Sequence, residues 1–93
     1  KQVTDGLKLQ YQQAKTEFEY QLNTFNTQER NLELSKKILD KTQLKFKEGV
    51  ASSLDFTQAQ NQYLETLTNY TRSALSLLQA KSKMERVLGN YNL

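Results

Sequence analysis

Large apolar residues recur every seven positions on both sides of a single break in this chain. They are Tyr11, Phe18, Phe25, Leu32, Leu39 and Phe46 before the break, and Phe56, Tyr63, Tyr70, Leu77 and Met84 after it. A sustained seven-residue repeat predicts a helix that packs along one seam against another helix, with a left-handed supercoil. The sequence therefore predicts two long helices.

The break itself combines a signal that ends a helix with one that begins the next. Gly49 suits the position just after a helix, because glycine adopts the left-handed backbone conformation at no steric cost. Ser52, followed three residues later by Asp55, predicts a capping box at the start of the second helix. The alternative is one long bent helix that contains Gly49, and the adjacent cap signals argue against it.

We therefore predict an all-α fold, an antiparallel two-helix coiled-coil hairpin. The expected helices cover about 4–48 and 52–89, the second ended by Gly89, with the turn at 49–52. The chain opens Lys-Gln-Val without an initiator methionine, so we interpret residues 1–93 as a single hairpin segment of a larger protein.

The two repeats come into phase when the chain folds back near Ala51. Except for Val87, the residue three positions after each large one is small or polar. Layers of large and small side chains therefore alternate along the seam, which lets two helices interlock closely. The predicted large layers are Phe46–Phe56, Leu39–Tyr63, Leu32–Tyr70, Phe25–Leu77 and Phe18–Met84. The predicted small layers are Thr42–Ala59, Ser35–Thr66, Gln28–Ser73 and Gln21–Ala80.

Further apolar residues lie off this seam. They are Tyr20, Leu22, Leu34 and Ile38 in the first half, and Leu64, Leu67, Ala74, Leu75 and Leu78 in the second. A two-helix hairpin leaves such residues in water, which is unfavourable by about 25 cal/mol per Å² of apolar surface. The pattern predicts an assembly in which each hairpin packs against others.

The composition argues against several classes of function. The 93 residues include no His and no Cys, so neither an imidazole base nor a thiolate metal site can form. The carboxylates Glu17, Glu19, Glu29, Glu33 and Asp40 are spread among Lys and Arg, as on the charged surface of a coiled coil. A net charge of +3 is too small and too mixed to indicate nucleic-acid binding. We expect no enzyme, no cofactor and no membrane-spanning helix in this segment.

The turn and the second helix contain a distinctive set of residues. They are Phe46-x-x-Gly49-Val50-Ala51-Ser52-x-Leu54-Asp55-Phe56-x-x-Ala59-Gln60, then Leu64, Leu67, Tyr70, Ala74, Leu77-Leu78, Ala80 and Val87-Leu88-Gly89. This pattern resembles the helical hairpin of the TolC-type outer membrane efflux proteins. The opening Asp5-Gly6-Leu7-x-Leu9-Gln10-x-Gln12-Gln13-Ala14 is also similar to the family's entry into the preceding helix. The resemblance covers essentially the whole chain and is specific at the turn.

The resemblance implies a protein larger than this chain. Members of the family are trimers in Gram-negative bacteria, with an outer-membrane β-barrel and a periplasmic α-helical tunnel built from hairpins. The hairpin tips close or open the tunnel and meet a periplasmic adaptor protein, which links to an inner-membrane pump. By resemblance, the adaptor-binding tip comprises Gly49, Val50, Ala51, Ser52, Ser53 and Leu54, and Asp55 is the candidate acid of the pore mouth. The Leu88-Gly89 pair near the end of the second helix favours the interpretation that this segment is the C-terminal of the protomer's hairpins.

Two residues depart from the family pattern. Ala51 stands where many members carry Arg, and Gln58 where some carry a second Asp.

Two alternatives stay open. Arg30-x-x-x-Leu34 begins a signature of the adaptor's own hairpin, although Lys41 stands where a Ser should follow. A generic structural coiled-coil hairpin also fits. For Asp55, simple N-capping is the alternative to a role at the pore mouth.

Overall fold

The computed structural model describes residues 2–91, with the side chains of residues 6–89, as an all-α helical hairpin. Helix α1 runs from Gln2 to Lys47 and helix α2 from Ser53 to Tyr91. The break between them lies where the cap signals predict it. The chain divides into two compact units, which we call the turn unit (26–72) and the terminal unit (1–25 with 73–93).

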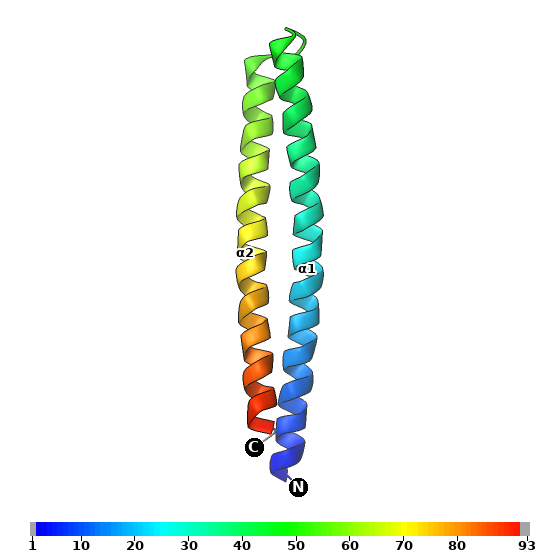
Figure 1. The fold of residues 1–93 in the computed structure, drawn as a ribbon, viewed down its shortest axis with the longest axis vertical. Helices are drawn as coiled ribbons and strands as arrows, with labels where there is room; N and C mark the ends of the chain where they lie inside the picture. Colours follow the sequence, from blue (N-terminus) through cyan, green and yellow to red (C-terminus); the bar gives the residue numbers. More distant parts are fainter. Residues whose placement is uncertain (1, 92–93) are drawn as a thin grey trace. The chain divides into compact units, whose positions relative to one another are not determined.

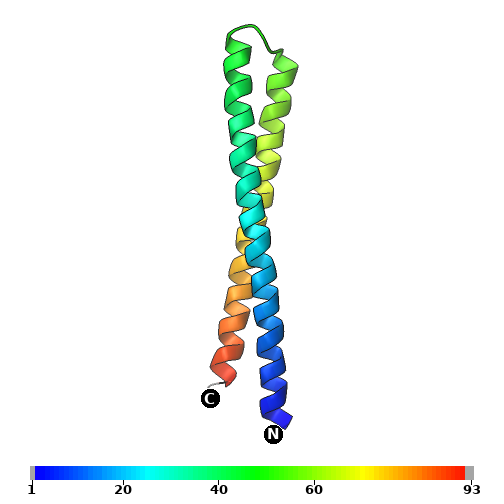
Figure 2. The ribbon, with the colours of Figure 1, turned by 90° about the vertical axis from the view of Figure 1, so that its right-hand side faces the viewer.

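In the turn unit, a segment of α1 packs antiparallel against a segment of α2. The green parts of the two helices lie side by side in Figure 1, and the view turned by 90° in Figure 2 agrees. The predicted register is confirmed at two layers. The rings of Phe46 and Phe56 have centroids 5.3 Å apart, and the hydroxyl oxygens of Ser35 and Thr66 are 2.6 Å apart.

The Ser35–Thr66 layer also satisfies its own polar atoms. Ser35 Oγ lies 2.9 Å from the carbonyl oxygen of Leu32, and Thr66 Oγ1 lies 2.9 Å from that of Tyr63. One hydroxyl can therefore donate to the other, which donates in turn to its own helix. Buried hydroxyls cost little stability when they are hydrogen-bonded in this way.

The terminal unit packs in a similar way around buried alanines. Ala14 of α1 and Ala80 of α2 are buried, and Ala80 lines the same groove as Gln21, its predicted layer partner. The large seam residues Phe18, Phe25, Leu77 and Met84 are half-buried.

The small seam positions are the most deeply covered in both units. The buried residues are Ala14, Ser35, Ala59, Ser73 and Ala80, and among the described residues no large side chain is fully buried. Two helices can cover only the narrow line where they touch, so the large residues flank that line and stay partly in water. The core is therefore thin, as the single seam predicts.

One predicted boundary is wrong. Gly89 does not end the second helix, which continues to Tyr91, and among the described glycines only Gly49 has a positive φ. A glycine inside a helix costs only about 1 kcal/mol relative to alanine, so it does not stop a helix by itself. The first helix likewise begins at Gln2, before the expected start near residue 4.

Candidate docking surface at the helix turn

Gly49 ends α1 in a Schellman motif. Its φ of +75° is in the left-handed region. Its N–H donates to the carbonyl of Phe46 at 3.1 Å, and the Val50 N–H donates to the carbonyl of Lys45 at 2.8 Å. These two bonds satisfy carbonyls that would otherwise be left open at the end of the helix. The Ala51 N–H also donates to the Lys45 carbonyl, at 3.2 Å, which ties the turn back onto α1.

Ser52 and Asp55 form the predicted capping box. The Asp55 N–H donates to Ser52 Oγ at 3.1 Å, and the Ser52 N–H donates to Asp55 Oδ2 at 3.3 Å. The Phe56 N–H donates to the Ser52 carbonyl at 3.2 Å, which starts the helical bonding of α2. The carboxylate also lies in the first turn of α2, where the helix dipole favours negative charge.

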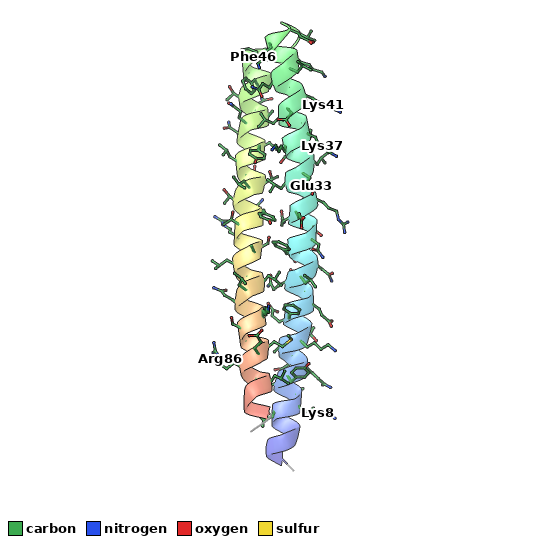
Figure 3. All side chains as sticks on the ribbon, in the orientation of Figure 1. Lys8, Glu33, Lys37, Lys41, Phe46 and Arg86 are labelled. Atoms are coloured by element: carbon green, nitrogen blue, oxygen red, sulfur yellow. The ribbon has the colours of Figure 1, made fainter. Side chains whose placement is uncertain are left out.

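The Phe46–Phe56 pair forms the apolar base of the turn. The two rings are tilted by 36°, and Phe46 is labelled just below the turn in Figure 3. This arrangement agrees with the preference of aromatic pairs for offset or tilted packing, and such pairs stabilise by about 0.5–1.5 kcal/mol beyond their burial. The turn is thus held by backbone bonds, one capping box and one aromatic pair.

The side chains of the turn point outward and form no core of their own. Val50 is 74% exposed and Leu54 is 63% exposed, while Ala51 is half-buried and Ser52 and Ser53 are exposed. A Cβ added to Gly49 would meet nothing within 4 Å. The space above the backbone at Gly49 is therefore open, and within the chain it is the positive φ that requires glycine there.

The surroundings of the turn are basic on α1 and nearly uncharged on α2. The C-terminal part of α1 carries Lys36, Lys37, Lys41, Lys45 and Lys47 against Asp40, and Glu48 follows the helix. In contrast, α2 has no charged residue from Phe56 to Leu64. Figure 3 labels Lys37 and Lys41 along α1.

Across the described residues, no group of His, Cys, Asp or Glu could hold a metal ion, and neither helix has an apolar stretch long enough to cross a membrane.

Of the seven predicted site residues, 49–52 lie in the turn and 53–55 lie in the first turn of α2. Sequence reasoning identified Gly49, Ser52 and Asp55 because each belongs to a capping pattern with fixed spacing. It did not find that the Lys45 carbonyl accepts two N–H groups, because backbone geometry carries no side-chain signal. The direction of Val50 and Leu54 was likewise open until the turn geometry was fixed.

Comparisons with known proteins do not assign this chain. No protein-family model, no curated protein and no solved structure matches it.

Proposed function

We propose that this chain is a stave of the periplasmic α-helical tunnel of a trimeric outer membrane efflux channel. In this proposal the hairpin tip at 49–54 docks a periplasmic adaptor protein, and through it an inner-membrane pump, while Asp55 is the candidate acid of the pore mouth. The segment is then the periplasmic portion of an outer membrane protein in a Gram-negative cell. It has a structural role in a conduit, with no catalytic chemistry.

One observation carries the proposal: hydrogen bonds hold the backbone of the turn, yet two apolar side chains beside it are exposed to solvent. A Schellman motif and a capping box fix the backbone, while Val50 and Leu54 are largely exposed above it. A turn that only reverses the chain needs no exposed apolar residues. A docking turn does, because apolar contacts at the centre of an interface supply most of its affinity.

The exposed apolar residues off the seam support the stave role. In the turn unit they include Leu34, Leu64 and Leu67, and in the terminal unit Leu75 and Leu78. Exposed apolar patches at regular helical spacing are typical of surfaces that pack against a neighbour. The adaptor hairpin and the generic hairpin share this feature. The flanking gene sequence separates the three, because amphipathic β-strands indicate a channel and a lipoyl-like β-domain indicates an adaptor.

The experiment that tests docking places a bulky residue at Gly49 in the full-length channel. We expect Gly49→Leu to abolish efflux, measured as drug susceptibility, because the side chain occupies the open space above the turn. Both Gly49→Leu and Gly49→Ala strain the positive φ by about 1–2 kcal/mol. Alanine is therefore the matched control, and we expect it to retain efflux. If Gly49→Leu supports efflux at normal channel abundance, the turn does not dock.

A further inference from the structure

The charged residues of α1 in the turn unit are divided between two sides of the helix. On one side, which we call the mixed flank, three carboxylates accompany two lysines: Glu29, Glu33, Lys36, Asp40 and Lys47. On the other side and along the outer crest, which we call the basic flank, there are four cations and no carboxylate: Arg30, Lys37, Lys41 and Lys45. Successive members of each set are three, four or seven positions apart, so each set shares a face of the helix. All nine side chains are exposed.

The basic flank borders a groove between the two helices of the turn unit. Residues that line this groove include Asn31, Leu34 and Ile38 of α1 with Gln62 and Asn69 of α2. Each of its two apolar residues is followed three positions later by a lysine, Lys37 or Lys41, so these lysines lie along the α1 edge of the groove. The groove therefore has apolar and amide side chains inside it and positive charge along one edge.

The two central lysines of the basic flank, Lys37 and Lys41, are unpaired. Neither ammonium group forms an ion pair in the part of the chain that the structure describes. Across the groove the charge of Glu65 is offset by that of Arg72, and the remaining carboxylates on this side of the turn unit lie at the turn itself. Like charges four positions apart destabilise a helix. Fold stability therefore does not account for this row of lysines, which indicates a surface used for binding.

We propose that the basic flank and its groove bind an acidic helix of the partner protein that docks at the turn. The proposal rests on the channel function for the presence of such a partner, and it adds the chemistry of the partner's contact surface. Carboxylates four residues apart on a helix are separated by about 6 Å along its axis, the same step as from Lys37 to Lys41. A helix that lies along α1 can therefore pair its carboxylates with successive lysines.

The residues among the lysines favour a protein helix over another kind of polyanion. Leu34 is 58% exposed and Ile38 is 38% exposed, and both lie beside the row of lysines. An amphipathic acidic helix offers apolar side chains for these two residues as well as carboxylates for the lysines. A phosphate backbone or an anionic polysaccharide offers the charge alone. The combination of exposed apolar residues with unpaired lysines is therefore complementary to an acidic helix.

The test uses two synthetic helical peptides as probes. Both are about 20 residues long, which is enough for a helix in an alanine-rich sequence, and both carry leucine on one face. The acidic peptide has glutamate at every fourth position beside the leucines, and the reference peptide has glutamine there. We expect the acidic peptide to bind the chain about tenfold more tightly, measured by fluorescence anisotropy at constant ionic strength. Equal affinity of the two peptides, or an oligonucleotide that binds as tightly as the acidic peptide, overturns the proposal.

Matched variants of α1 test whether the contact lies on the basic flank. Lys37→Gln with Lys41→Gln, and Lys36→Gln with Lys47→Gln, each remove two positive charges from exposed positions of the turn unit. We expect the first pair to lower the affinity for the acidic peptide about tenfold, and the second pair, on the mixed flank, to change it by less than about twofold. Circular dichroism checks that both variants stay helical. Equal losses would mean that general charge attracts the peptide, and would overturn the proposal.

The same double variants separate this proposal from the channel function. In the full-length channel we expect Lys37→Gln with Lys41→Gln to lower efflux at normal channel abundance, and Lys36→Gln with Lys47→Gln to leave it unchanged. If Gly49→Leu abolishes efflux and the basic-flank variant does not lower it, the turn docks without the basic flank and this proposal fails. If Gly49→Leu supports efflux, the channel function fails, while the peptide assay still decides whether the flank binds an acidic helix.

Discussion

Asp55 has two possible roles that single substitutions can separate. The structure shows its capping role, since its carboxylate accepts the Ser52 N–H and its own N–H binds Ser52 Oγ. Asp55→Asn keeps an oxygen acceptor and removes the charge, whereas Asp55→Ala removes both. We expect Asp55→Ala to lower the free energy of unfolding by about 1 kcal/mol, and Asp55→Asn to lower it by less. Thermal unfolding, monitored by circular dichroism at one fixed protein concentration, measures these losses of stability.

The same pair of variants tests the pore-mouth hypothesis in the full-length channel. If Asp55 helps to hold a resting tunnel shut, Asp55→Asn should raise the passive permeability of the outer membrane. The folding stability of this variant channel should stay near that of the unaltered channel. Unchanged permeability in both variants would leave capping as the whole role of this carboxylate.

Ser35 tests whether the seam needs small residues or polar ones. Its side chain is 4% exposed and contacts Thr66 through a hydroxyl–hydroxyl bond. Ser35→Ala leaves Thr66 able to donate to its own backbone, so we expect a loss below about 1 kcal/mol. Ser35→Leu forces the helices apart, and we expect it to cost about 1–3 kcal/mol. Urea unfolding ranks the two, and equal losses would show that the hydroxyl matters more than the space.

At the scale of the helices, the sequence predicted the seam and one boundary well. The seven-residue repeat is a strong signal because the same residue size returns at every second turn. Gly49 was identified because Ser52 and Asp55 follow at capping distance, so independent patterns agreed. Gly89 lacked such support, and α2 has no basic residue in its last turn. A glycine without neighbouring cap signals is therefore weak evidence for a helix end.

The register of the two helices makes a direct prediction within the turn unit. Cysteines at Leu39 and Tyr63 should form a disulfide within one chain, because these residues line one groove at the same seam layer. Cysteines at Leu39 and Tyr70 are offset by one seven-residue repeat, about 10 Å along the helix, and should not. Gel mobility under non-reducing conditions at low protein concentration distinguishes them. A disulfide in the offset pair and none in the level pair would contradict the register.

At the scale of the whole chain, sequence reasoning could locate the candidate site but not its partner. The site residues follow from capping rules, which act over a few neighbouring positions. What binds them depends on a second surface that lies outside this chain, so no pattern within it can identify the partner. The exposed apolar residues mark where contacts should form, because their burial is favourable whichever helix covers them. They leave the identity of the neighbour to experiment.

Self-association of the chain is the prediction that tests this surface as a whole. Leu64 and Leu67 of the turn unit and Leu75 and Leu78 of the terminal unit are exposed on α2. Since burial of such side chains stabilises an interface by about 25 cal/mol per Å², we expect sedimentation to show oligomers at concentrations on the order of tens of micromolar. Replacement of the four leucines by glutamine should yield a monomer, whereas Leu44→Gln should not. A folded monomer of the unaltered chain at those concentrations would contradict the stave role.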